Sequence, residues 1–146
     1  MNIAPRLRAL SRRFALVWVG FVLLLAVAPV HDVHAQSAAQ SVRLVVDYGD
    51  GVVKIFDRLP WSKGITVLDV LNAAKASAHG ITFSYTGLGP SALLTDIDGL
   101  QNQGGGSSAK NWQYWVNTTY AQKSFAVFDV QAEDTVFWRF TTEHGG

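Results

Sequence analysis

Aromatic residues on an alternating pattern between Trp112 and Phe140 constrain the fold of this chain more than any other feature. Nine aromatic residues fall within 29 positions. In the segments N-W-Q-Y-W-V-N and T-V-F-W-R-F, large apolar side chains recur at every second residue, which is the period of a β-strand with one buried face. The segment therefore predicts a strand near Trp112, an irregular second strand over residues 124–131 and a third strand that ends near Phe140, closing a sheet.

The first 35 residues have the features of an export signal. Four arginines lie among residues 6–13, residues 14–28 are uncharged and almost wholly apolar, and Val33 and Ala35 place small side chains before a cleavage point. We therefore expect cleavage after Ala35 and a secreted or periplasmic protein that begins at Gln36. The alternative is an N-terminal membrane anchor, although the uncharged core is shorter than the roughly 20 residues of a spanning helix.

Composition after residue 35 excludes several classes of function. The remaining 111 residues hold eight basic and ten acidic side chains, a formal charge of −2, without a Lys/Arg cluster. Nucleic acid and an anionic membrane surface are therefore not expected as partners. The chain has no cysteine, so disulfides, thiolate zinc sites and thiol catalysis are excluded. A chain of this length must hold itself with one hydrophobic core.

A hairpin is expected at the start of the mature chain. Residues 36–41 are expected to form a flexible leader. Residues 42–47 alternate apolar and polar side chains, Asp50-Gly51 suits a tight turn, and residues 52–59 form the partner strand that Pro60 ends.

Residues 64–78 change to the period of a helix. An apolar stripe runs along one side, and Thr66 with Asp69 fits a capping box. Gly80 suits the position that ends the helix. The residues of the stripe are Val67, Val70, Leu71, Ala74 and Ala78.

Two strands are expected after the helix, over residues 81–85 and 92–97, followed by a glycine- and serine-rich loop over residues 99–110. One helix among several strands predicts the α+β class. We expect a single domain over residues 42–141 and a tail over residues 142–146.

Four short motifs occur in order along this domain. They are G-I-T-V-L-D-V-L from Gly64, I-D-G-L from Ile97, W-Q-Y-W-V-N from Trp112 and E-D-T-V-F-W-R-F from Glu133. The series resembles the C-terminal β-domain of the transcobalamin and intrinsic-factor proteins, a pattern that many bacterial exported domains share. The resemblance implies a β-grasp fold, in which a mixed sheet wraps one helix. Thr118 and Glu133 stand where the family has turn glycines, so we expect these two turns to differ in shape.

The resemblance implies binding of a soluble ligand, with cobalamin or another corrinoid as the candidate and no cofactor required. In that family the β-domain covers one side of cobalamin, and a helical domain holds the other side. This chain has no helical domain and offers half of such a site. A smaller or flatter ligand, or a partner protein that completes the site, is equally compatible. The alternative function is an extracytoplasmic interaction module that docks a partner protein at the cell surface.

Alternation selects the candidate ligand-binding residues. If Trp112 and Trp138 point toward the helix, their neighbours along each strand point to the open side of the sheet. An exposed indole beside a second ring suits a planar ligand. Alternatively, Trp115 and Phe137 pack under the loop at residues 99–110, and that loop is either the edge of a binding cleft or only a connector. The candidate residues are Gln113, Trp115, Asn117, Phe137 and Arg139.

Catalytic and metal chemistry have no support in the residues. His79 and His144 are the histidines after residue 35, and no third partner completes a metal cluster or a Ser-His-Asp triad. Ser107-x-x-Lys110 matches a serine nucleophile motif, but its companion motifs are missing. We therefore expect a protein that is not an enzyme and binds no metal, with His79 placed near the end of the helix.

Overall fold

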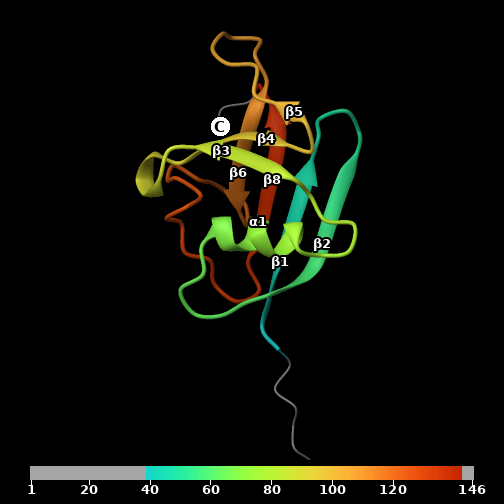
Figure 1. Cartoon of the computed structure of the whole chain (residues 1–146), viewed down its shortest axis with the longest axis vertical. Helices are drawn as coiled ribbons and strands as arrows, with labels where there is room; N and C mark the ends of the chain where they lie inside the picture. Colours follow the sequence, from blue (N-terminus) through green and yellow to red (C-terminus); the bar gives the residue numbers. More distant parts are fainter. Residues whose placement is uncertain (1–38, 143–146) are drawn as a thin grey trace, which may run out of the picture. The chain divides into compact units, whose positions relative to one another are not determined.

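A five-stranded mixed sheet organises the part of the chain that the computed structural model describes, residues 39–142 (Figure 1). The strand order is β2-β1-β8-β6-β7, with β1 and β8 parallel and the other pairs antiparallel. The predicted signal peptide and its cleavage point, most of the leader, and residues 143–146 with His144 lie outside the described residues. The strands are β1 (Ser41–Asp47), β2 (Val53–Pro60), β6 (Asn111–Val116), β7 (Thr119–Tyr120) and β8 (Thr135–Thr141).

The predicted hairpin is confirmed in β1 and β2. Its turn is held by Asp47 Oδ1, which accepts from Gly49 N at 2.8 Å, and by Asp50 Oδ1, which accepts from Val52 N at 2.9 Å. Gly49 has a φ of 71°, and a Cβ placed there would lie 2.4 Å from Phe140 O. This position therefore needs glycine. The pairing of β1 with β2 is irregular between Val42 and Leu44, and β2 forms one edge of the sheet.

The helix α1 (Val67–Lys75) packs the predicted stripe from Val67 to Ala74 on one face of the sheet, whereas Ala78 lies beyond its end and is exposed. The predicted capping box is present, because Thr66 Oγ1 accepts from Asp69 N and Asp69 Oδ2 accepts from Thr66 N. The predicted end was wrong: Ala76 caps the helix, and His79 rather than Gly80 takes the left-handed conformation, with a φ of 59°. No helix within residues 39–142 is long and apolar enough to cross a membrane.

Residues 121–134 were expected to include an irregular strand, but the structure shows a loop there with one isolated bridge. This loop supplies carbonyl groups to the start of α1. Phe128 O accepts from Val67 N and Phe125 O accepts from Leu68 N, both at 3.0 Å. The first N–H groups of a helix have no partner within the helix, so the loop satisfies them. Phe125 and Val130 are buried beneath it.

A second sheet of order β3-β4-β5 packs on the core beside α1. Asp98 ties this sheet to the hairpin, because its carboxylate accepts from Tyr48 Oη at 2.6 Å, Lys54 Nζ at 2.7 Å and Thr82 N at 2.7 Å. Burial alone would raise the pKa of Asp98, but these donors, Lys54 foremost, hold it below its ordinary value of 3.8. The elements are β3 (Phe83–Thr86), the short 3-10 turn η1 (Gly89–Ser91), β4 (Leu93–Ile97) and β5 (Leu100–Gln101).

The alternation predicted for the aromatic segment is confirmed. On β6 and β8, every second side chain is buried against α1 and the core. The buried residues are Trp112, Tyr114, Val116, Val136, Trp138 and Phe140.

Glu133 adopts the conformation that glycine favours. Its φ is 67°, a left-handed value that glycine adopts without strain. Replacing Glu133 by glycine should relieve the strain of a left-handed backbone that carries a side chain. This gain outweighs the added freedom of the unfolded chain, so the free energy of unfolding should rise by about 0.5 to 1 kcal/mol. Urea unfolding measures the change. Glu133→Ala keeps the strain and should give no gain; an equal gain in both variants would contradict this account.

Asp98 should make stability depend on pH. Because its folded pKa is lowered, its contribution to stability is complete above pH 3.8 and is lost as the pH falls through the folded value. Asp98→Asn, which suits the left-handed φ of 50° at this position, should be less stable at pH 7 and lose less stability between pH 5 and 2.5. Urea unfolding across this range tests it; parallel curves for both proteins would refute the role of Asp98.

Candidate functional site

A row of apolar side chains crosses the face of the sheet opposite α1, which we call the outer face. Trp115 on β6 lies between Phe137 on β8 and Tyr120 on β7, with ring centroids 5.7 and 5.4 Å away. Phe137 is paired with Val45 on β1, and Val45 with Ile55 on β2, whose side chain is 50% exposed. These five residues form the outer row, which spans all five strands and brings together two candidate residues, Trp115 and Phe137.

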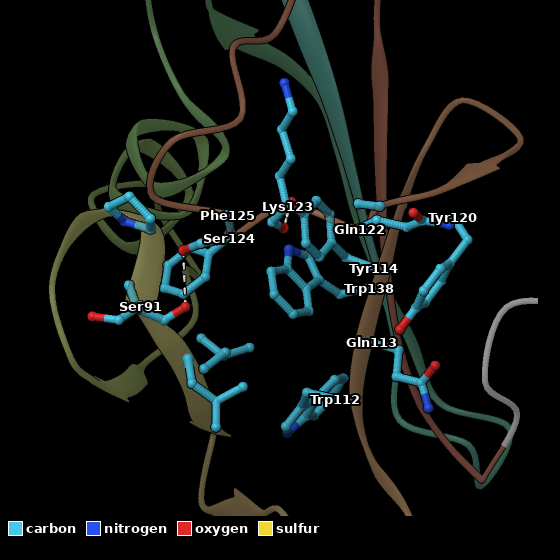
Figure 2. A pocket seen from close by; sticks show the side chains of 15 residues that line it. Ser91, Trp112, Gln113, Tyr114, Tyr120, Gln122, Lys123, Ser124, Phe125 and Trp138 are labelled. Carbon is cyan, nitrogen blue, oxygen red and sulfur yellow. Dashed lines mark hydrogen bonds between the residues drawn. The ribbon is translucent and has the colours of Figure 1, made fainter.

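Gln113 and Arg139 lie beside this row, directly opposite one another on β6 and β8. Arg139 Nε is 3.3 Å from Asp47 Oδ2, so the guanidinium is paired within the sheet. Gln113 was expected to face solvent, but it is only 8% exposed. Its neighbours on the same face cover it: Arg139 stands opposite, and Figure 2 shows the Tyr120 ring reaching toward it.

Asn117 is separated from the other candidates by its role in a turn. It follows β6 with a φ of 56°, a conformation that asparagine tolerates better than most residues. Its Nδ2 donates to Asp134 Oδ1 at 2.9 Å, and its Oδ1 accepts from Thr135 N at 3.0 Å. The amide therefore fastens the turn to the start of β8 and is already occupied by protein groups.

The glycine-rich loop joins the outer face at the opposite end of β6 from Trp115. Gly104 N donates to Asn111 Oδ1 at 3.1 Å, and Asn111 Nδ2 donates to Gly104 O at 2.9 Å. A hydrogen bond closes the base of the loop, in which Lys110 N donates to Gln103 Oε1 at 2.8 Å. Four residues of strand, about 13 Å, separate Asn111 from Trp115. The hydrogen bonds of the loop thus place it at the border of the face, with Gln113 between loop and indole.

A cavity of about 380 Å³ lies on the opposite, inner side of β6 and β8, a volume in the range of small-molecule sites (Figure 2). One wall is η1 with the start of β4, and the other consists of the rings of Trp112, Tyr114 and Trp138. Residues 120–125 close one side, where Ser124 Oγ donates to Ala92 O at 2.8 Å. Sequence reasoning assigned these rings to the core and missed the cavity, because alternation identifies the inward side and not how completely it is filled.

One polar group of this cavity has a hydrogen-bond partner in the protein and another has none. Tyr114 Oη donates to Lys123 O at 2.6 Å. Burial, with a smaller effect of Tyr120, raises the pKa of Tyr114 above its ordinary value of 10, so the hydroxyl remains a donor at neutral pH. Trp138 is 2% exposed, and its Nε1 has no hydrogen-bond partner among the described residues.

No three His, Cys, Asp or Glu side chains within residues 39–142 are arranged to hold a metal ion. His79 is exposed just beyond the end of α1.

Residues 64–142 match the sequence model of a family described as Domain of unknown function (DUF4430). The match covers more than half of the 146 residues and runs from the residues before α1 to the end of β8. The chain belongs to this family. No curated protein matches the sequence.

Among solved structures, the DUF4430 chain is similar to haptocorrin in complex with Cbi. The TM-score is 0.58 at 15% sequence identity, and the similarity covers 70% of this chain. It covers 25% of the haptocorrin chain, so this protein spans about a quarter of that structure. At this identity the similarity shows a shared fold, namely a small α+β domain with one helix and a mixed sheet.

The two faces of β8 should respond differently to truncation. Phe137→Ala removes a half-buried ring on the outer face and should lower the free energy of unfolding by about 1 to 2 kcal/mol. Phe140→Ala, three residues along the same strand, removes a core ring and should cost about 3 to 5 kcal/mol. Urea unfolding of both variants measures the difference. Equal losses would mean that the outer face is packed like the core.

Proposed function

We propose that this protein is an exported, non-enzymatic binding domain of β-grasp type that holds a soluble small ligand on its outer face. The observation that carries the proposal is the outer row, in which Trp115 and Phe137 lie side by side on adjacent strands. An apolar ring array on the solvent side of a small sheet is unusual, because that face normally carries polar residues.

The outer face suits a flat molecule with polar groups at its rim. Trp115 and Phe137 provide apolar surface at one end, and the loop at Gly104 borders the other end. Gln113 lies between them and is buried, so the rings and the loop supply the accessible contacts. A planar ligand about 13 Å long would contact both the rings and the loop.

A corrinoid is the ligand class that we propose first. The four sequence motifs resemble the β-domain of cobalamin-binding proteins, and the fold is shared with haptocorrin, whose structure contains Cbi. This chain spans a quarter of haptocorrin, and we propose that it covers one side of such a ligand. We therefore expect weak binding by this chain alone, strengthened where a partner covers the other side of the ligand.

Export is proposed from the N-terminal sequence. The basic start, the apolar stretch and the small residues before Gln36 have the order of a cleaved signal peptide, with an N-terminal anchor as the alternative. A chain without cysteine is compatible with an oxidising compartment, because it carries no thiol to be oxidised or mispaired.

Replacing Trp115 by alanine should weaken corrinoid binding. The full chain, expressed with its own N-terminal segment, is dialysed to equilibrium against cobalamin and cobinamide, because corrinoids absorb indole emission and would distort fluorescence. We expect saturable binding by the wild type and a loss of at least about tenfold in Trp115→Ala, the size expected when a large apolar contact is removed. Tyr85→Ala, which removes an exposed ring on β3 in the other sheet, should bind normally.

Two results would count against the proposal. Binding that Trp115→Ala leaves unchanged would place the ligand elsewhere, and no binding at millimolar protein would reject the corrinoid. The second outcome favours a docking module for a partner protein, which is the alternative function. Its specific support is the exposed apolar side chains of Val52, Val53 and Ile55 at the edge of the sheet.

A further inference from the structure

The cavity beneath η1 contains an unusual tryptophan. Among the described residues, the indole nitrogens of Trp61 and Trp112 donate to Val130 O at 2.8 Å and Leu100 O at 2.7 Å. Trp138 is as deeply buried as these residues or more so, yet its Nε1 has no partner in residues 39–142. An indole N–H can only donate, and buried donors are nearly always paired. The protein therefore leaves one hydrogen-bond acceptor missing in this cavity, at Trp138 Nε1.

The walls around this N–H are mostly aromatic. The Trp138 ring stacks on Tyr114, with centroids 4.7 Å apart, and meets the edge of Phe125 at 5.8 Å. Figure 2 shows the Trp138 ring standing in the space between Ser91 and Tyr114, with its nitrogen toward the end where Lys123 and Ser124 lie. The flat walls favour a planar molecule.

The other polar groups of the cavity offer few free partners for the charge of a ligand. Tyr114 Oη and Ser124 Oγ already donate to backbone carbonyl groups. Lys123 is the charged residue of the lining; it is exposed, and Figure 2 shows its side chain extending away from the rings. Burying a charge among the rings without a partner would be costly. An uncharged molecule fits this environment better.

Several residues that line the cavity are exposed to solvent. Leu93 is 59% exposed, and Pro90, Ser91 and Gln122 are also exposed. The volume of about 380 Å³ accommodates one or two fused rings.

We propose that this cavity is a second binding site, for a small uncharged planar aromatic molecule that presents a hydrogen-bond acceptor to Trp138 Nε1. It lies on the other side of β6 from Trp115, because Tyr114 and Trp115 point to opposite sides of the strand, and Gln113 and Tyr120 border both sites. A ring nitrogen or carbonyl oxygen of the ligand supplies the missing acceptor. The rings supply the apolar contact.

Quinoline and naphthalene are matched probes for this site, since they share shape and differ in one acceptor nitrogen. The full chain, labelled with ¹⁵N, is titrated with each at pH 7.5, and the indole N–H resonances are followed by NMR. We expect quinoline to bind about 3- to 10-fold more tightly than naphthalene. Only quinoline should move the Trp138 indole N–H resonance downfield. That resonance is identified as the one that disappears in Trp138→Phe.

Two further variants separate the acceptor from the apolar contact. Trp138→Phe should weaken binding of quinoline more than that of naphthalene, so that the two probes bind equally tightly. Trp112 also lines the cavity, but its indole N–H is already paired. Trp112→Phe should therefore lower the affinity for both probes by the same factor. Trp61→Phe lies outside the cavity and should change neither.

Equal binding of the two probes by the wild type, or a Trp138 resonance that quinoline does not move, would overturn the proposal without reliance on any variant. Trp115→Ala separates this site from the outer face. It should leave quinoline binding unchanged whether or not corrinoid binding is found.

Discussion

The position of β8 between β1 and β6 is the constraint on which the rest of the structure depends. It pairs in parallel with β1 and antiparallel with β6, so it joins two parts of the sheet that would otherwise be separate. Arg43 and Thr135, far apart in the chain, become neighbours through this pairing. Such non-local pairs are slow to form, and here no complete sheet exists before the strand is in place.

Both candidate sites depend on the register of β8. Phe137 points to the outer row, while Trp138, the next residue, points into the cavity. A slip of one residue would exchange the two faces and place Arg139 in the core. The burial of Val136 and Phe140 on the same side as Trp138 holds the register, because a slip would expose all three. The packing of the core thus positions two chemically different surfaces.

Local patterns in the sequence predicted the elements that depend on local physics. The alternation around Trp112 and Trp138 predicted two strands and their inward sides, and Thr66 with Asp69 predicted the start of α1. The loop at residues 121–134 could not be predicted, because its apolar residues bury themselves without a regular period. Its carbonyl groups bond to the start of α1, a tertiary contact that no local pattern encodes.

In the candidate sites, too, local patterns predicted some features and tertiary contacts determined the others. The pair of Trp115 and Phe137 follows from alternation once β6 and β8 are neighbours. The burial of Gln113 depends on Tyr120, which reaches it from β7, and the unpaired N–H of Trp138 depends on where backbone carbonyl groups happen to lie. Sequence indicates which side chains are large and which way they point. It does not indicate which of their polar atoms are satisfied.

The edge formed by β2 has a consequence for how this protein behaves in solution. An apolar row that reaches a free edge strand invites a second molecule to add its own strand there. Lys54, Asp57 and Arg58 place charges along β2, Pro60 offers no N–H, and the irregular pairing with β1 distorts the edge. These features oppose strand addition between copies, so the outer row can stay open to the proposed ligand without inviting association through this edge.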